Sequence, residues 1–156
     1  MSSEKRPGGL TALAVINFII GGFGILGALG SAIAVPMLTR LPPEAAADIP
    51  PEQLAQIDAM LEIGTPVFLM LAVVSLISAS LLIIAGIGYV KQKKFLGRTI
   101  GNAYGIFGIL ATLSRVFMMP AALGGGSFGL GTIIGLVYPV LTLILIDTMF
   151  KDDLVN

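Results

Sequence analysis

The chain has 156 residues, of which 56% are hydrophobic and only 12% charged, and its formal net charge is zero. Its mean hydropathy of +0.98 lies well outside the range of a soluble globular protein. Cysteine and histidine are both absent, which excludes a disulfide framework, a thiol nucleophile, an imidazole base and the usual zinc and haem ligands. The composition therefore indicates a membrane protein, and we expect no cofactor and no bound metal.

Four long apolar runs fill most of the chain, at about residues 10–38, 66–90, 99–119 and 130–150. Each reaches or exceeds the roughly 20 residues that a helix needs to cross about 30 Å of hydrocarbon. The segments between them are too short to form a second domain. We therefore predict an all-α integral membrane protein, with residues 1–156 forming a single membrane domain. Its expected architecture is a four-helix transmembrane bundle made of two antiparallel hairpins.

The first run also has some features of a secretory signal peptide. Basic residues precede it, and the small-residue pattern Ala32-Ile33-Ala34 lies near its end. Cleavage there would leave three spanning helices. The run is much longer than the apolar core of a usual signal peptide, which has about 7–15 residues. This length favours an uncleaved helix, and the cleaved form stays as the alternative.

The link 39–65 is the sizeable segment outside the apolar runs. Pro42 and Pro43 end the first helix, because a proline ring has no N–H to continue the hydrogen-bond ladder. From Pro51 to about Ile63, apolar residues recur at helical spacing, with acidic and amide side chains on the opposite face. We predict a short amphipathic helix here. Its acidic face favours packing on protein, because helices that bind lipid surfaces are usually rich in Lys and Arg.

Basic residues are sorted to one side of the predicted membrane. They precede the first run, crowd the loop between the second and third runs, and follow the fourth: Lys5, Arg6, Lys91, Lys93, Lys94, Arg98 and Lys151. The opposite side has Arg40 among acidic residues. Short loops rich in Lys and Arg stay in the cytoplasm. We therefore predict a multi-pass protein of the cell membrane with both termini cytoplasmic and the amphipathic helix extracytoplasmic.

Glycines recur at four-residue spacing in the third and fourth runs. Two successive steps join Gly97, Gly101 and Gly105, and one joins Gly131 and Gly135. Small residues let helix backbones approach closely, which drives association where the hydrophobic effect between helices is missing. These five glycines are the candidate helix-packing residues. Packing within the chain is the simpler interpretation, and contact with a second copy or another membrane protein is the alternative.

Polar residues within the runs are the candidate site residues, because they are costly in lipid and usually face protein or water. Asn17, Asn102 and Asp147 share a depth near the cytoplasmic side, where they could form a polar cluster or simply hydrogen-bond between helices. Arg115 lies near the opposite side, about 20 Å from Asp147 in depth, so the two cannot form a direct ion pair. We expect Arg115 to extend to the interface or to meet Glu62 or a backbone carbonyl.

Three classes of function remain after these exclusions. The favoured hypothesis is a small non-enzymatic structural or accessory subunit of a homo-oligomer or a larger membrane complex, with the lipid bilayer as its surroundings. The alternative is a small transporter or channel for an ion or small solute, based on the polar candidates and on a predicted kink at Pro139. A membrane enzyme is the weakest hypothesis. The basic loop needs no nucleic-acid partner, since topology and anionic lipid explain it.

Overall fold

The computed structural model describes residues 8–38, 40, 42, 49–119, 123 and 129–154. Its main elements are α1 (Gly8–Leu38), α3 (Pro51–Ile63), α4 (Thr65–Val90), α5 (Ile100–Met118) and α6 (Leu130–Ile144). Two π-helical turns, η1 (Phe95–Thr99) and η3 (Leu145–Met149), extend α5 and α6. The predicted all-helical class is confirmed, and four of the helical stretches are long and apolar enough to span a membrane.

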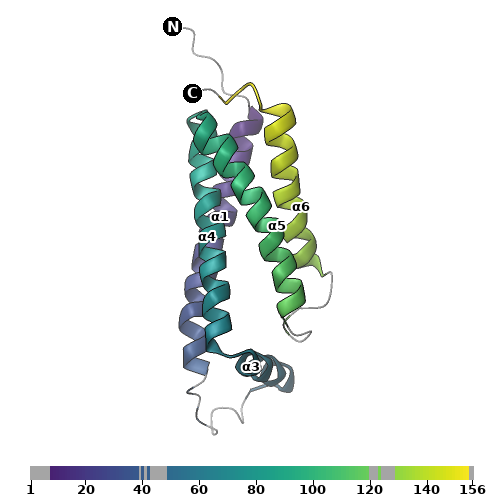
Figure 1. The fold of residues 1–156 in the computed structure, drawn as a ribbon. Helices are drawn as coiled ribbons and strands as arrows, with labels where there is room; N and C mark the ends of the chain where they lie inside the picture. Colours follow the sequence, from purple (N-terminus) through teal and green to yellow (C-terminus); the bar gives the residue numbers. More distant parts are fainter. Residues whose placement is uncertain are drawn as a thin grey trace.

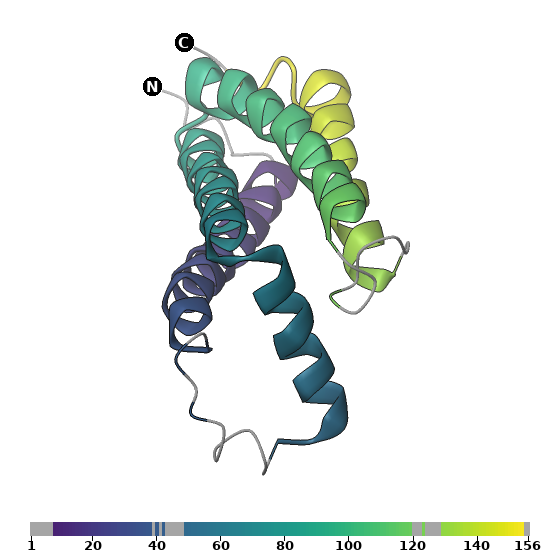
Figure 2. The same ribbon diagram turned by 60° about the horizontal axis from the view of Figure 1, so that its bottom comes forward.

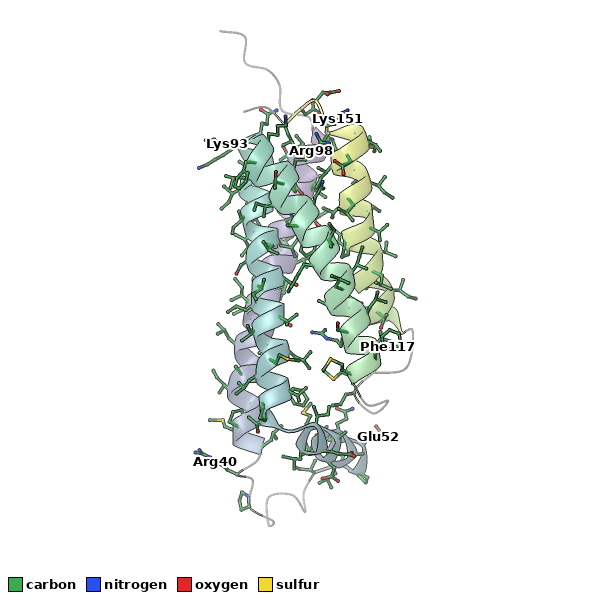
Figure 3. All side chains as sticks on the ribbon, in the orientation of Figure 1. Arg40, Glu52, Lys93, Arg98, Phe117 and Lys151 are labelled. Carbon is green, nitrogen blue, oxygen red and sulfur yellow. The ribbon has the colours of Figure 1, made fainter. Side chains whose placement is uncertain are left out.

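The long helices lie side by side in two pairs (Figure 1). Helix α1 packs along α4, and α5 packs along α6. The two pairs meet where α4 contacts η1 and the start of α5, and α5 then diverges from α4 toward α3 (Figures 1 and 2). We call the end with Lys93, Arg98 and Lys151 the basic end, and the end with Arg40 and Glu52 the α3 end (Figure 3).

Helix α3 has the predicted bounds, beginning at Pro51 and ending at Ile63. Proline suits the first turn, where its missing N–H has no partner to lose. Gly64 follows in a left-handed conformation with φ of 83°, which turns the chain directly into α4. Its N–H donates to the carbonyl of Met60 at 3.3 Å. The helix lies across the end of the molecule and contacts α4 (Figure 2).

A cluster of buried apolar side chains lies at the basic end. Helices α1 and α4, η3 and the segment after it all contribute to this cluster: Leu10, Leu13, Ala14, Ala85, Tyr89, Ile146, Phe150 and Leu154. Large apolar side chains elsewhere on the long helices are mostly exposed, for example Phe23 and Phe117. This distribution is typical of helices that face lipid, and it leaves the pairs of helices joined mainly at one end.

Glycines make the closest helix contacts. A Cβ on Gly101 would overlap the Tyr89 hydroxyl and lie 2.6 Å from Cδ1 of Ile146, and a Cβ on Gly105 would overlap the side chain of Leu143. In η1, a Cβ on Gly97 would lie 2.9 Å from Cδ2 of Leu154. These candidate packing positions therefore face other parts of the same chain.

Helices α6 and α4 add further glycine contacts. Gly135 lies against Thr112, with 3.0 Å between its ideal Cβ position and Thr112 Oγ1. Gly131 belongs to α6, but its surroundings lie outside the described residues. The tightest position is Gly88 in α4, which the sequence pattern did not single out. A Cβ there would overlap the backbone of Leu96 and Gly97.

The contact at Gly88 predicts a large difference between two Gly→Ala substitutions. Gly88→Ala should destabilise the fold by about 3 kcal/mol or more, because backbone atoms cannot move aside as a side chain can. Gly22→Ala in α1 should be neutral or stabilising by up to about 1 kcal/mol, since nothing lies within 4 Å of its Cβ position. Thermal unfolding in detergent measures both, and equal melting temperatures for the two variants would contradict the contact.

Candidate functional site

The two π-helical turns bring together the one ion pair among the described residues. Arg98 Nε of η1 lies 3.0 Å from Asp147 Oδ1 of η3. The amide of Asn102 donates to the same carboxylate, with 3.2 Å between Nδ2 and Oδ2. The side chains of Arg98 and Asp147 are 30% and 42% exposed, so the pair contributes little more than a surface salt bridge. The ion pair joins η1, which precedes α5, to η3, which follows α6.

Asn17 is fully buried, and its hydrogen-bond partners differ from those of this ion pair. Its Nδ2 donates to the carbonyl of Leu82 in α4 at 3.2 Å. Its Oδ1 accepts a hydrogen bond from the hydroxyl of Tyr138 in α6. The sequence placed Asn17, Asn102 and Asp147 in one group, whereas the structure pairs the last two and gives Asn17 other partners. One amide therefore links α1, α4 and α6.

Pro139 in α6 has a specific hydrogen-bonding consequence. A proline at this position leaves the carbonyl of Gly135 without its helical donor, because the ring has no N–H. Thr112 of α5 supplies a donor, with 3.1 Å between its Oγ1 and that carbonyl oxygen. The same hydroxyl lies 2.8 Å from the carbonyl of Gly108, so one hydrogen serves two acceptors. The freed backbone group thus becomes a contact between α5 and α6.

Arg115 is an exposed residue in the last turn of α5, near the α3 end. Its Nη2 lies 3.2 Å from Ser75 Oγ on α4. Ser75 is ten residues into α4, roughly 15 Å along the helix from its start, whereas Arg115 is three residues from the end of α5, roughly 5 Å. The side chain therefore reaches toward the middle of the molecule. Among the described residues its partner is therefore Ser75, and not the expected Glu62 or a backbone carbonyl.

A cavity of about 480 Å³ lies between the α1–α4 pair and the α5–α6 pair. It occupies the region where α5 diverges from α4 (Figure 1). Arg115 lines it together with hydroxyl groups of α4 and α5, including Ser75, Ser78 and Thr112. Apolar side chains such as Leu82 make up much of the remaining wall. The cavity has the size and mixed lining of a small-molecule site.

The tyrosines are the interior polar residues that sequence reasoning missed. Tyr89, Tyr104 and Tyr138 come from three helices, and the rings of the last two lie 6.2 Å apart between centroids. The Tyr89 hydroxyl is buried without a hydrogen-bond partner among the described residues. Tyrosine in a membrane helix usually marks the interface, so position alone did not indicate interior contacts. Their placement depends on which face each helix turns inward.

The described residues contain no group of three acidic side chains that could hold a metal ion. Comparison of the chain with protein-family models, with curated proteins and with solved structures finds no match. The function therefore has to be argued from the geometry of the chain itself. Three features carry that argument: the interhelical polar contacts, the glycines that face away from the chain, and the cavity beside Arg115.

The Pro139 contact predicts an energetic coupling between two helices. Thr112→Val should cost about 1 kcal/mol, because it removes the donor to the Gly135 carbonyl. In a Pro139→Ala background the cost should fall, since the new N–H of residue 139 can bond that carbonyl within α6.

Thr148→Val is the matched control for this cycle, because its hydroxyl bonds the carbonyl of Ile144 within its own helical segment at 2.6 Å. Its cost should be the same in both backgrounds. Melting temperatures of the wild type, the three single variants and the two double variants with Pro139→Ala, all in detergent, give the coupling. An equal cost of Thr112→Val with and without Pro139 would show that Thr112 does not serve the freed carbonyl.

Proposed function

We propose that the chain is a four-helix transmembrane bundle of the cell membrane with both termini cytoplasmic. The two helix pairs are then antiparallel hairpins, the basic end faces the cytoplasm, and α3 lies outside. The observation that supports this orientation is the segregation of charge, with Lys93, Arg98 and Lys151 at one end and both Glu52 and Arg40 at the other (Figure 3). Basic residues close to membrane helices are retained in the cytoplasm.

The proposed orientation predicts which positions are accessible from outside the cell. The chain contains no cysteine, so single cysteines can be introduced at Gln92 in the basic loop and at Gln53 on the exposed side of α3. A membrane-impermeant maleimide added to intact cells should label the cysteine at 53 and not the one at 92. Labelling at 92 in intact cells would contradict the proposed orientation.

Within this membrane, we propose a non-enzymatic role as a structural or accessory subunit that assembles with a second copy or with another membrane protein. The observation that carries this proposal is the unused glycine surface of α1. Gly27 and Gly30 are exposed, and nothing of the chain lies within 4 Å of their Cβ positions. Glycine in the middle of a helix costs about 1 kcal/mol relative to alanine. Contact with a further helix would offset this cost.

Other glycines of α1 do face a neighbouring helix, unlike Gly27 and Gly30. A Cβ on Gly21 would lie 2.8 Å from Cγ1 of Ile83, and one on Gly24 would lie 3.0 Å from Cβ of Ala79. Helix α1 therefore has an inner glycine face against α4 and an outer one with Gly27 and Gly30. The outer face has the small side chains that close helix packing in membranes requires.

The intramembrane polar residues favour the structural role over the alternative, a transporter or channel for an ion or small solute. Asn17 is engaged by Leu82 and Tyr138. Asp147 is engaged by Arg98 and Asn102 at the basic end. Each set already joins helices, as polar groups in membrane bundles commonly do. The hydrogen bond of Arg115 with Ser75 shares no residue with either set.

The assembly proposal predicts that one α1 face is sensitive to size and another is not. Gly27→Leu should reduce the fraction of assembled protein at least tenfold, because a large side chain separates helices that pack through glycine. Gly22→Leu is the matched control, since Gly22 also has nothing within 4 Å but lies about 140° around the helix from Gly27.

Assembly can be measured in native membranes by crosslinking through a single cysteine at the exposed Ala34. Crosslinked dimers support a homo-oligomer, and crosslinks to a different protein support a larger complex. In either case Gly27→Leu should remove the crosslinks without changing the melting temperature. A chain that forms no crosslink to any protein, or one that crosslinks equally with Leu at position 27, would contradict the proposal.

A further inference from the structure

The position of the Arg115 guanidinium is the starting point for a binding site that is independent of assembly through α1. A long cationic side chain near a helix end normally extends to the interface, where water and lipid headgroups solvate it. Arg115 instead reaches from the last turn of α5 to Ser75, which lies deeper along α4. A guanidinium is charged at every physiological pH. Within the proposed membrane such a charge is costly unless it meets anionic or polar groups.

The described residues supply little compensation for this charge. The one ion pair among the described residues joins Arg98 to Asp147, and Arg115 is not part of it. Among the described residues, its hydrogen-bond partner is the neutral hydroxyl of Ser75, which can accept a hydrogen bond but carries no charge. Four of the five N–H groups of a guanidinium stay available after one such bond. The site is therefore electrostatically complementary to an anion.

The cavity beside Arg115 has both polar and apolar side chains in its wall. Arg115, Ser75 and Thr112 line it on the side of the α3 end. Leu82 also lines it, seven residues further along α4 than Ser75 and so roughly 10 Å deeper. Ile20 of α1 and Pro139 of α6 add to the apolar wall. A free anion would leave this apolar part unused, whereas an acyl chain would fill it.

We propose that this cavity binds a single-chain anionic amphiphile, with its acid group at Arg115 and Ser75 and its acyl chain directed toward Leu82. The acid group is a phosphate or a carboxylate, both of which a guanidinium can bind through two parallel hydrogen bonds. The ligand keeps the orientation of a lipid in the nearer leaflet, with its head toward the α3 end. The volume of about 480 Å³ lies within the usual range of ligand pockets, about 300–1,000 Å³.

Three related probes separate the contributions of the head and the chain. Oleoyl lysophosphatidate has both, monooleoylglycerol lacks the phosphate, and glycerol phosphate lacks the chain. Native mass spectrometry of the full chain in dodecyl maltoside measures the stoichiometry and the dissociation constant for each. We expect one lysophosphatidate per chain, bound at least tenfold more tightly than either fragment. A tenfold change corresponds to about 1.4 kcal/mol.

Two substitutions test the residues, and one controls for overall charge. Arg115→Gln should weaken lysophosphatidate binding at least tenfold, because the charge at the head is lost. Arg40→Gln removes the same charge from an exposed position at the same end of the molecule (Figure 3). It should change the dissociation constant for lysophosphatidate less than twofold. Ser78→Phe keeps Arg115 but places a ring in the cavity that Ser78 lines, and it should also abolish binding.

The proposal is overturned if Arg115→Gln binds as the wild type does, or if Arg40→Gln loses as much affinity as Arg115→Gln. It is also overturned if glycerol phosphate binds as tightly as lysophosphatidate, which would indicate a site for a free anion. Equal binding of monooleoylglycerol would indicate an apolar site without a role for the charge. The comparison of the three probes uses the wild-type chain, so a variant that fails to fold leaves this test intact.

Discussion

The close backbone approach between α4 and η1 is the contact on which the rest of the structure depends. Gly88 has no side chain, and so the backbone of Leu96 and Gly97 can lie directly against it. Helices in lipid gain little from the hydrophobic effect, and close packing has to supply their association. This contact brings the α5–α6 pair to the α1–α4 pair at the basic end, where the buried cluster around Tyr89 and Ile146 completes the junction.

Away from that junction the two pairs lie farther apart, because α5 diverges from α4 toward the α3 end (Figure 2). The divergence leaves the cavity that Arg115 and Ser75 line from opposite sides. Polar contacts still join the helices beyond the junction, and each has a local cause. Thr112 meets the carbonyl that Pro139 frees, and Asn17 meets a backbone carbonyl and a tyrosine hydroxyl. In a medium without water, unsatisfied groups have to find partners within the protein.

Much of the candidate site could be predicted as a list of residues, and little of it as a set of contacts. Asn102 and Asp147 were expected near each other from their depth, and they do form a hydrogen bond. Asn17 has a similar depth but faces Tyr138, because depth says nothing about the direction in which a helix turns each side chain. Arg115 was expected to extend to the interface or to meet Glu62 or a backbone carbonyl, and the structure gives it Ser75 of α4 as a partner, a residue 40 positions away in the sequence.

The sequence by itself determined the helical class, the four apolar helices and the short helix from Pro51 to Ile63, because chain length against bilayer thickness and proline positions are local properties. It also determined where glycines allow close approach. The tertiary structure decided which glycines are used: Gly101 and Gly105 face Tyr89 and Leu143, whereas Gly27 faces away from the chain. It alone formed the cavity, since a space between helices depends on the angle between them, and that angle is set by contacts between residues far apart in the sequence.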